Sequence, residues 1–559
     1  MTDRAGADPQ AGQRGRARHA KRRTRGPQDA LVRSSALLAL GTVVSRATGM
    51  VRLVMQGSAL GVAVVGGAYN TANTMPTSLY TLMIGGALNS VLVPQLVRAR
   101  AEHPDGGRAH EQRLVTLVLS VLAVGTAAAV VFAPQIVGIY TPDSPGSHQN
   151  FELTVAFARF LLPQVFFYGL FFMLGQVLNA RGKFGAMGWT PVLNNLVLIS
   201  MFGVYMWMAP TPGSAAQVTP GQVRLLGLAT TAGIAVQALC LVPALVRSDF
   251  GFRPRFDWRG VGLGKSVSAA RWTLLFVLVN QVALAVVTRY ANAVDAELPR
   301  AGAGNSAYFF AQNIWMLPQA IITVSLVTAM LPRMSRAVVE RRLDDMREDL
   351  SRGLRVSGAV IVPTAFFFLM FGPQIAVVMF SYGSGGAAST QPLGQMLQAF
   401  ALGLIPFSAQ YLLLRGFYAF EDTRTPFWMA VWISVLDIAL ATACHLWLPP
   451  RWAVIGMAAA YAVSYLIGMV VTAVLLRRQL DRRLDGKRLM RTYGKLAFAA
   501  ATAAAAGWGA ASGLVDFTPQ PTVSALVTLA AGGAVMLPVF LLLGRVLKIS
   551  ELRSLPGRG

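Results

Sequence analysis

Charged residues are scarce in this chain. Only 13% of its 559 residues are Asp, Glu, Lys or Arg, and 54% are hydrophobic, whereas soluble domains usually carry roughly 25% charged residues. The shortage extends along the whole sequence, in which long apolar stretches follow one another with short polar connections. A soluble chain of this length would divide into domains joined by polar linkers. We therefore expect one all-α integral membrane domain.

Cysteine and histidine are also rare, with two Cys and five His in the chain. Cys240 and Cys444 lie in separate apolar segments, and no two His have the spacing of metal ligands. The sequence has no Gly-Lys-Ser/Thr phosphate loop and only scattered carboxylates in its predicted outer loops, so ATP hydrolysis and glycosyl transfer are excluded. We expect no cofactor, no metal and no enzymatic activity.

The net charge of +25 is distributed in short blocks between apolar runs. No basic face is interleaved with aromatic residues that would stack on bases, so nucleic acid is excluded as a partner. Residues 1–30 are rich in Arg, and we expect them to form a disordered basic cytoplasmic tail. Such a tail orients the chain, or contacts anionic membrane lipids.

About fourteen stretches are apolar over the roughly 20 residues that a helix needs to cross a bilayer. Several contain Pro or Gly, which is tolerated where neighbouring helices satisfy the freed backbone groups. The predicted spans are residues 34–62, 68–97, 114–139, 152–180, 185–209, 222–246, 264–291, 305–332, 354–380, 392–419, 425–448, 453–476, 491–514 and 522–547.

The positions of the basic residues orient these spans, because cytoplasmic connections are enriched in Lys and Arg. Basic clusters follow the second, sixth, eighth and twelfth spans, at residues 98–113, 247–265, 333–355 and 477–495. The odd-numbered connections and their edges contain only Arg224, Arg300 and Arg451. This alternation predicts a multi-pass protein with both termini in the cytoplasm.

The second and eighth predicted spans resemble each other. Each has an internal Pro, Pro76 or Pro318, and a second one near the basic connection, Pro94 or Pro332, at offsets of 242 and 238 residues. A repeat of six helices preserves orientation, as in transporters built from parallel repeats. We expect two six-helix lobes around a central cavity and two extra C-terminal helices. The predicted boundaries are 31–248 and 249–484 for the lobes, 485–548 for the extra helices and 549–559 for a cytoplasmic tail.

Two arginines lie inside the first predicted span. A charge at the bilayer centre costs at least about 2.5 kcal/mol, so such residues are candidates for function. Arg46 is near mid-depth, Arg52 lies about 9 Å further along the helix, and Ser45 shares the face of Arg52. Because Arg binds phosphate oxygens bidentately, we predict that all three contact an anionic pyrophosphate headgroup. The alternative is that the arginines pair with carbonyls or carboxylates inside the bundle.

Polar residues in other spans extend this predicted binding site. Asn73, Asn280, Gln312 and Asn313 are expected to contact the sugar or peptide of the substrate, and Arg159 is expected in an outer vestibule. For the amide side chains, hydrogen bonding between helices is the alternative.

Asp437 is the only acidic residue near the middle of a predicted span. It is a candidate ion or charge-pair site that would bind a proton or sodium, or pair with Arg415 or a backbone donor. If the cavity is positive and the substrate anionic, an inside-negative membrane potential would assist export, since one charge crossing 100 mV is worth about 2.3 kcal/mol.

Several motifs in the first twelve spans carry a family resemblance. They are Ser45-Arg46-Ala47-Thr48-Gly49 with Arg52, the units from Pro76 to Pro94 and from Pro318 to Pro332, and Gly416-Phe417-Tyr418-Ala419 followed by Asp422-Thr423-Arg424-Thr425-Pro426. In these motifs the chain resembles the MurJ/MviN-type lipid II flippases of the multidrug/oligosaccharidyl-lipid/polysaccharide exporter superfamily. The sequence departs from better-known members at Gln312-Asn313, where they carry an Asp-Arg pair, and its predicted cavity is less charged than theirs.

The resemblance implies a protein of the bacterial inner membrane that serves cell wall biogenesis and cell shape. It would carry the lipid-linked peptidoglycan precursor, lipid II, from the inner to the outer leaflet by alternating access. Cell-wall synthesis or division proteins are its implied partners, and the extra helices would form a groove for the lipid tail.

Other functions remain open at this point. The protein could move another polyprenyl-linked oligosaccharide, whereas a drug antiporter for cations would be expected to carry cavity carboxylates. It could instead be a non-transporting membrane scaffold for cell-wall synthesis that docks partners on the basic tail and the 333–355 connection.

Overall fold

The protein is helical throughout the part that its computed structural model describes. The described residues are 27–85, 107–144, 146–181, 185–212, 214–248, 251, 253–257, 263–382, 386–480, 484–513 and 520–553. Most of the two predicted tails, and Pro94 of the repeat motif, lie outside the described residues. The fold class predicted from the sequence is confirmed.

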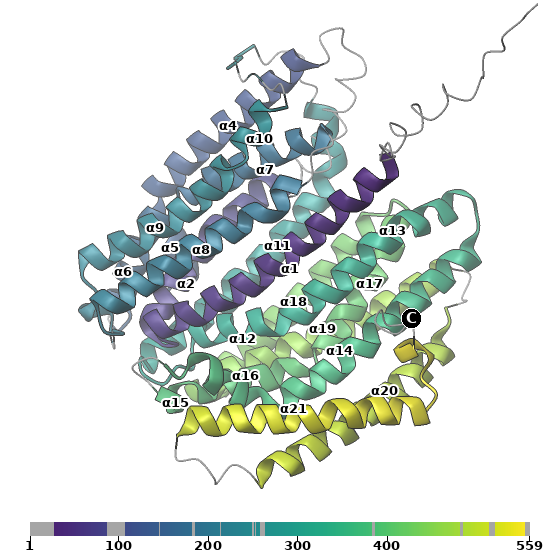
Figure 1. Ribbon diagram of the computed structural model, residues 1–559. Helices are drawn as coiled ribbons and strands as arrows, with labels where there is room; N and C mark the ends of the chain where they lie inside the picture. The colour runs from purple at the N-terminus through teal and green to yellow at the C-terminus, as the bar shows by residue number, and fades with distance from the viewer. Residues whose placement is uncertain are drawn as a thin grey trace, which may run out of the picture.

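The first half of the chain forms one bundle, shown in purple to teal in Figure 1. Its helices are α1 (Pro27–Leu60), α2 (Val64–Tyr80), the π-helix η1 (Thr81–Gly85), α4 (Arg108–Val131), α5 (Ala133–Tyr140), α6 (His148–Leu161), α7 (Gln164–Ala180), α8 (Gly185–Met208), the 3-10 helix η2 (Ala215–Gln217), α9 (Pro220–Leu239) and α10 (Val242–Val246).

The second half forms a second bundle beside the first, followed by a C-terminal pair of helices. The bundle contains α11 (Leu263–Glu297), α12 (Asn305–Pro318), the π-helix η3 (Gln319–Thr323), α13 (Val324–Val339), α14 (Leu343–Phe380), α15 (Gly386–Ser389), α16 (Gln391–Ala401), α17 (Leu404–Ala419), α18 (Arg424–Trp447) and α19 (Pro450–Gln479). The remaining elements are α20 (Gly486–Ser512), α21 (Pro521–Val546) and the 3-10 helix η5 (Ser550–Arg553).

Ten helices or continuous helix pairs in the described residues are long and apolar enough to cross a membrane, or eleven if α15–α17, bent by 48°, form one span. Each of the fourteen stretches predicted from the sequence overlaps a helix. A multi-pass membrane protein is thereby confirmed, whereas the count of fourteen spans stays a prediction.

The two halves repeat the same irregularities. The π-helices η1 and η3 each contain five residues and begin 238 residues apart, at Thr81 and Gln319. The breaks between α6 and α7 and between α16 and α17 are 240 residues apart. In α6–α7 the break lies at Pro163, which has no backbone N–H to donate. Matching breaks at a matching offset support the internal repeat.

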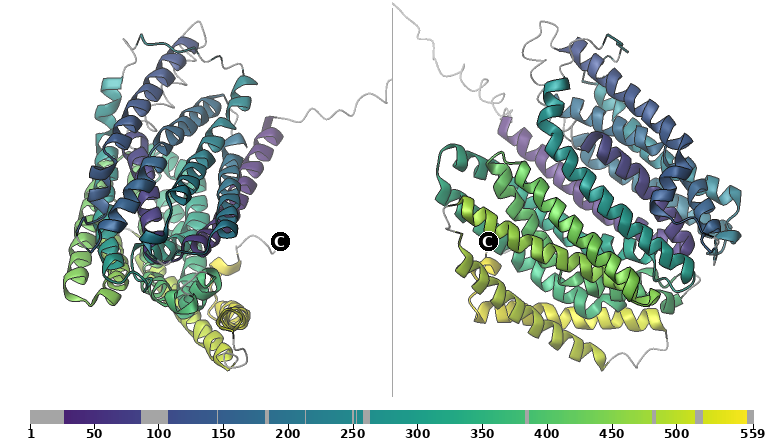
Figure 2. Two further views of the ribbon diagram at one scale, coloured as in Figure 1. Left: turned by 90° about the vertical axis from the view of Figure 1, so that its left-hand side faces the viewer. Right: turned by 180° about the vertical axis from the view of Figure 1, so that it is seen from behind.

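Separate apolar cores hold the two bundles together. Buried residues from α2, α5, α6, α8 and α9 form the main core of the first lobe, and residues from α11, α12, α14, α16 and α19 form that of the second. Figure 2 shows the lobes side by side from two further directions, with α20 and α21 along the outside of the second lobe. Both helices pack on α14. The C-terminal pair is therefore an addition to the second lobe.

Candidate functional site

A cavity of about 420 Å³ lies between α1 and α8 of the first lobe and α12 of the second. Four of the predicted site residues line it: Ser45, Arg46 and Arg52 from α1, and Asn313 from α12. We call it the arginine cavity. Six residues separate the two arginines on α1, and both nevertheless reach this one cavity.

The arginine cavity is positively charged, because no carboxylate is among the residues that line it. Arg52 is half-buried, and its Nε atom is buried without a hydrogen-bond partner among the described residues. Arg46 is exposed, and the described part of the chain contains no ion pair to either side chain. Guanidinium groups without a carboxylate partner are suited to an anion.

Helix α8 holds the segment of α1 that carries the arginines. The side-chain amide of Asn195 donates to the main-chain carbonyl of Ser45 and to the hydroxyl of Thr48, both at 3.0 Å. Thr48 in turn donates to the carbonyl of Val44 at 2.9 Å. These bonds fix the backbone next to Arg46.

A second, smaller cavity of about 110 Å³ lies inside the second lobe, between α11, α12, α18 and α19. Three more predicted residues line it, namely Asn280, Gln312 and Asp437, together with Ser434 and several tyrosines. We call it the carboxylate cavity. The predicted residues thus divide between two cavities rather than gathering in one.

Asp437 is 5% exposed, and its Oδ1 atom has no hydrogen-bond partner among the described residues. The predicted alternative of a pair with Arg415 is not what the structure contains. The guanidinium of Arg415 lies over the rings of Tyr411 and Tyr418, 4.2 and 5.2 Å from their centroids.

Asn73 and Arg159 line neither of these cavities. Asn73 accepts a hydrogen bond from Gln164 at 3.3 Å, which joins α2 to α7. Arg159 is exposed in the last turn of α6. Asn70, another polar residue of α2, is 1% exposed and accepts from Gln56 at 2.5 Å, so it bonds between helices.

A buried polar network joins the two lobes where α1 ends and α12 begins. The Asn292 amide on α11 donates to Thr71 Oγ1 at 3.0 Å, to the Tyr140 carbonyl at 3.0 Å and to Thr141 Oγ1 at 3.3 Å. From α12, the Asn305 amide donates to Thr71 Oγ1 at 2.8 Å. We call these residues the interlobe network. It lies at the end of the bundle opposite the Arg-rich 333–355 connection.

The Asp295 carboxylate extends this network. It is 1% exposed and accepts from the backbone N–H of Asn305, at the start of α12, at 2.9 Å. The close approach requires two glycines, because a Cβ atom at Gly67 of α2 would lie 2.6 Å from one carboxylate oxygen and a Cβ at Gly304 would lie 2.0 Å from the other. The carboxylate therefore sits against both lobes.

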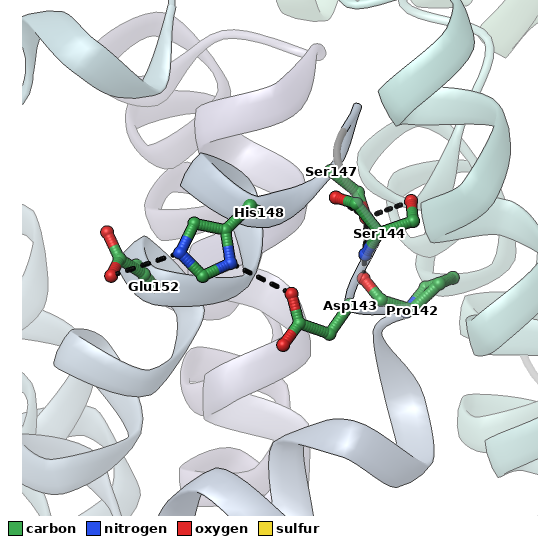
Figure 3. A network of polar contacts seen from close by, with 6 residues as sticks. All are labelled: Pro142, Asp143, Ser144, Ser147, His148 and Glu152. Carbon is green, nitrogen blue, oxygen red and sulfur yellow. Dashed lines mark hydrogen bonds and ion pairs between the residues drawn. The ribbon is translucent and has the colours of Figure 1, made fainter.

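The loop from α5 to α6 supports the network from outside (Figure 3). The Ser147 hydroxyl donates to the Pro142 carbonyl at 2.7 Å, while His148 lies between Asp143 at 2.9 Å and Glu152 at 3.4 Å. These contacts fold the segment that follows Thr141, an acceptor for Asn292.

Sequence reasoning did not select Asn195 or Asp295. A polar residue in an apolar helix is a signal, but the same signal marks structural amides such as Asn70. Distinguishing them needs the neighbouring helix, which the residue order does not identify.

Comparisons with known proteins agree with this fold and cavity. The family model described as "Lipid II flippase MurJ" matches residues 57–524. A "Probable lipid II flippase MurJ" of Rhizobium meliloti is 29% identical over 503 residues, covering 89% of each chain. A "Lipid II flippase MurJ" of Burkholderia cenocepacia is 26% identical over 404 residues, covering 71% of this chain and 74% of its own.

Two solved structures have a similar fold. "Lipid II flippase MurJ, inward closed conformation" superposes with a TM-score of 0.71 at 19% identity, over 92% of this chain and all of the other. A MATE family multidrug resistance transporter of the MOP superfamily, in an inward-facing conformation, gives a TM-score of 0.61 at 15% identity, over 79% of this chain and 98% of the other. With the family model matching most of its length, this chain belongs to the MurJ lipid II flippase family of membrane transporters.

Proposed function

We propose that this protein moves lipid II, the lipid-linked peptidoglycan precursor, from the inner to the outer leaflet of the bacterial inner membrane. The names of its relatives support this substrate. Both termini lie in the cytoplasm in this proposal, because the Arg-rich connections then face inward.

The observation that carries the proposal is the arginine cavity. Arg46 and Arg52 line one space with no carboxylate, at the boundary between the lobes. A pyrophosphate presents several oxygens that two guanidinium groups can bind bidentately. Ser45 and Asn313 contact the same headgroup. A cation would be repelled from this cavity, which argues against a cationic drug as the substrate.

Alternating access follows from the interlobe network. Its hydrogen bonds join the lobes at the end away from the Arg-rich connections, so in this proposal the outer side is closed. The lobes separate there to release the substrate outward and come together on the cytoplasmic side. Likeness to MATE-type transporter folds supports this motion.

The other predicted residues have secondary places in the proposal. Asn280 and Gln312 contact the sugar or peptide from the carboxylate cavity, and Asp437 provides a site for an ion or a charged partner. Asn73 and Arg159 act on the path between the cavity and the outer side. The helices α20 and α21 add a surface for the lipid tail.

Complementation tests the function and the cavity together. A strain depleted of its essential lipid II flippase would receive this chain, its Arg46→Ala variant or an Arg224→Ala variant, at matched abundance in the membrane. Arg224 is an exposed arginine of α9 outside both cavities and serves as the matched control. We expect rescue by the parent and by Arg224→Ala, and failure of Arg46→Ala.

Equal rescue by all three would remove Arg46 from the mechanism and leave the function in place. Failure of all three, with correct insertion, would contradict lipid II as the substrate and favour another polyprenyl-linked sugar or a scaffold.

A further inference from the structure

The arginine cavity contains two amide side chains whose orientation can be deduced. Asn195 lies 3.0 Å from the Ser45 carbonyl, which can only accept, so the atom facing it must be the Nδ2 donor. Its second hydrogen points to Thr48 Oγ1, at 3.0 Å, whose own hydrogen is used elsewhere on α1. Both hydrogens of the Asn195 amide are therefore engaged, and only its Oδ1 is left to bind a ligand.

The same reasoning applies to Asn313 on α12. Its Nδ2 donates to the Phe309 carbonyl at 2.8 Å, which fixes the amide with Oδ1 on the other side. Neither this oxygen nor Oδ1 of Asn195 is bonded to a described residue, and neither is among the buried unpartnered atoms. Both residues line the arginine cavity, Asn195 from the first lobe and Asn313 from the second.

Asn194 differs from this pair although it lines the same cavity. Its Oδ1 is buried, and a Cβ atom at Gly233 would lie 2.5 Å from it, so the oxygen faces α9. The acceptors left to the cavity by amide side chains are thus those of Asn195 and Asn313.

We infer that Asn195 and Asn313 form an acceptor pair that recognises N–H and O–H donors next to the phosphates of the ligand. Arginine has donors only, so it cannot satisfy such groups. A neutral amide oxygen suits a neutral donor, such as a sugar hydroxyl or an acylamino N–H. The inference rests on the proposed function, in which Arg46 and Arg52 hold the pyrophosphate, and it assigns recognition of the attached N-acetylated sugar to the two amides.

The location of the pair couples recognition to movement. Asn195 belongs to the first lobe and Asn313 to the second. A sugar bound by both connects the lobes across the cavity, whereas a bare pyrophosphate held on α1 contacts one lobe. A lipid without its sugar is therefore bound but does not bridge the lobes.

Binding of two probes separates these roles. Purified full-length protein would be titrated with a polyprenyl pyrophosphate carrying an N-acetylated disaccharide, and with the same polyprenyl pyrophosphate lacking the sugar. In Asn313→Leu we expect affinity for the sugar-bearing probe to fall about tenfold, as for the loss of one neutral hydrogen bond, with affinity for the sugar-free probe changed less than about twofold. Gln398→Met is the matched control, because Gln398 also donates to a main-chain carbonyl, at 2.8 Å, but outside both cavities.

Asn313→Ala provides a second variant if the leucine form does not fold. An equal loss for both probes, or no loss for either, would overturn the acceptor pair while leaving the proposed function standing. Failure of the parent chain to bind either probe would overturn the proposed function and the acceptor pair together. Arg46→Ala should give the opposite pattern and weaken binding of both probes.

Discussion

Asn292 of α11 donates its side-chain amide to the hydroxyl of Thr71 on α2, 3.0 Å away and 221 residues earlier in the chain. Both side chains are almost completely buried, at 1% and 0% exposure. Two polar groups without water between the lobes are stabilised only while the lobes stay together, because separating them leaves the groups unsatisfied. The pair therefore favours the closed arrangement of this end.

Replacing Asn292 with Leu should shift the protein toward separation of the lobes at this end. The variant loses three hydrogen bonds, each worth about 0.5–1.5 kcal/mol. Spin labels at Ala216 and Glu297, both exposed, would be introduced into a chain with Cys240 and Cys444 replaced. We expect a larger population of long label distances than in the parent.

The control for this experiment is Asn150→Leu. Asn150 is a buried residue of α6, and its substitution removes an amide from the first lobe without cutting a bond between lobes. Identical distance distributions in all three proteins would contradict a latching role for Asn292.

Gly67→Ala should separate the lobes by a steric route. The added methyl group would lie 2.6 Å from the Asp295 carboxylate, a distance that real Cβ contacts do not adopt. Overpacking of this kind costs about 1–3 kcal/mol, and we expect transport to fall. Gly138→Ala is the control, since a Cβ there would meet nothing within 4 Å. Full activity of Gly67→Ala would show that the lobes need not approach so closely.

The C-terminal segment is attached to α14 through a buried ion pair between Glu551 and Arg355. Their side chains are 7% and 8% exposed. Removing one partner of such a pair leaves an uncompensated charge and costs about 3–5 kcal/mol. We expect Glu551→Ala to lower the melting temperature in detergent markedly.

Two further variants identify the cause of that effect. Glu340→Ala breaks an exposed pair with Arg342 and should change the melting temperature little. Replacing both Arg355 and Glu551 with Met should recover part of the loss, because no charge is then left unpaired. A double variant less stable than Glu551→Ala would contradict this explanation.

The membrane potential should assist transport. The arginine cavity carries two positive charges without a lining carboxylate. An inside-negative potential draws an empty positive cavity inward and expels an anionic substrate, with about 2.3 kcal/mol for each charge moved across 100 mV. Dissipating the potential while ion gradients are held constant should therefore slow transport strongly. An unchanged rate would mean that charge movement does not drive the cycle.

Much of the fold could be predicted from the sequence, because apolar run length and basic clusters are local signals. The repeat was predictable as well, since prolines recur at a fixed offset, and the π-helices and helix breaks follow the same offset. Arg46 and Arg52 were selected because a charge in an apolar span is costly whatever surrounds it.

The division of the site was not predictable. Gln312 and Asn313 are adjacent in sequence, yet one lines the carboxylate cavity and the other the arginine cavity. Successive residues of a helix point about 100° apart, so their destinations depend on which helices pack on each side. That pairing is set by long-range contacts, as is the use of Asn195 to hold α1.

The central claim is that the arginine cavity carries the headgroup of a lipid-linked sugar across the bilayer. The most direct measurement is leaflet transfer of lipid II in vesicles containing the purified protein, with an inside-negative potential, comparing the parent with Arg46→Ala, Arg52→Ala and the Arg224→Ala control. The account predicts transfer by the parent and the control, and a loss of at least about tenfold in both cavity variants. Equal transfer by all four proteins would contradict it.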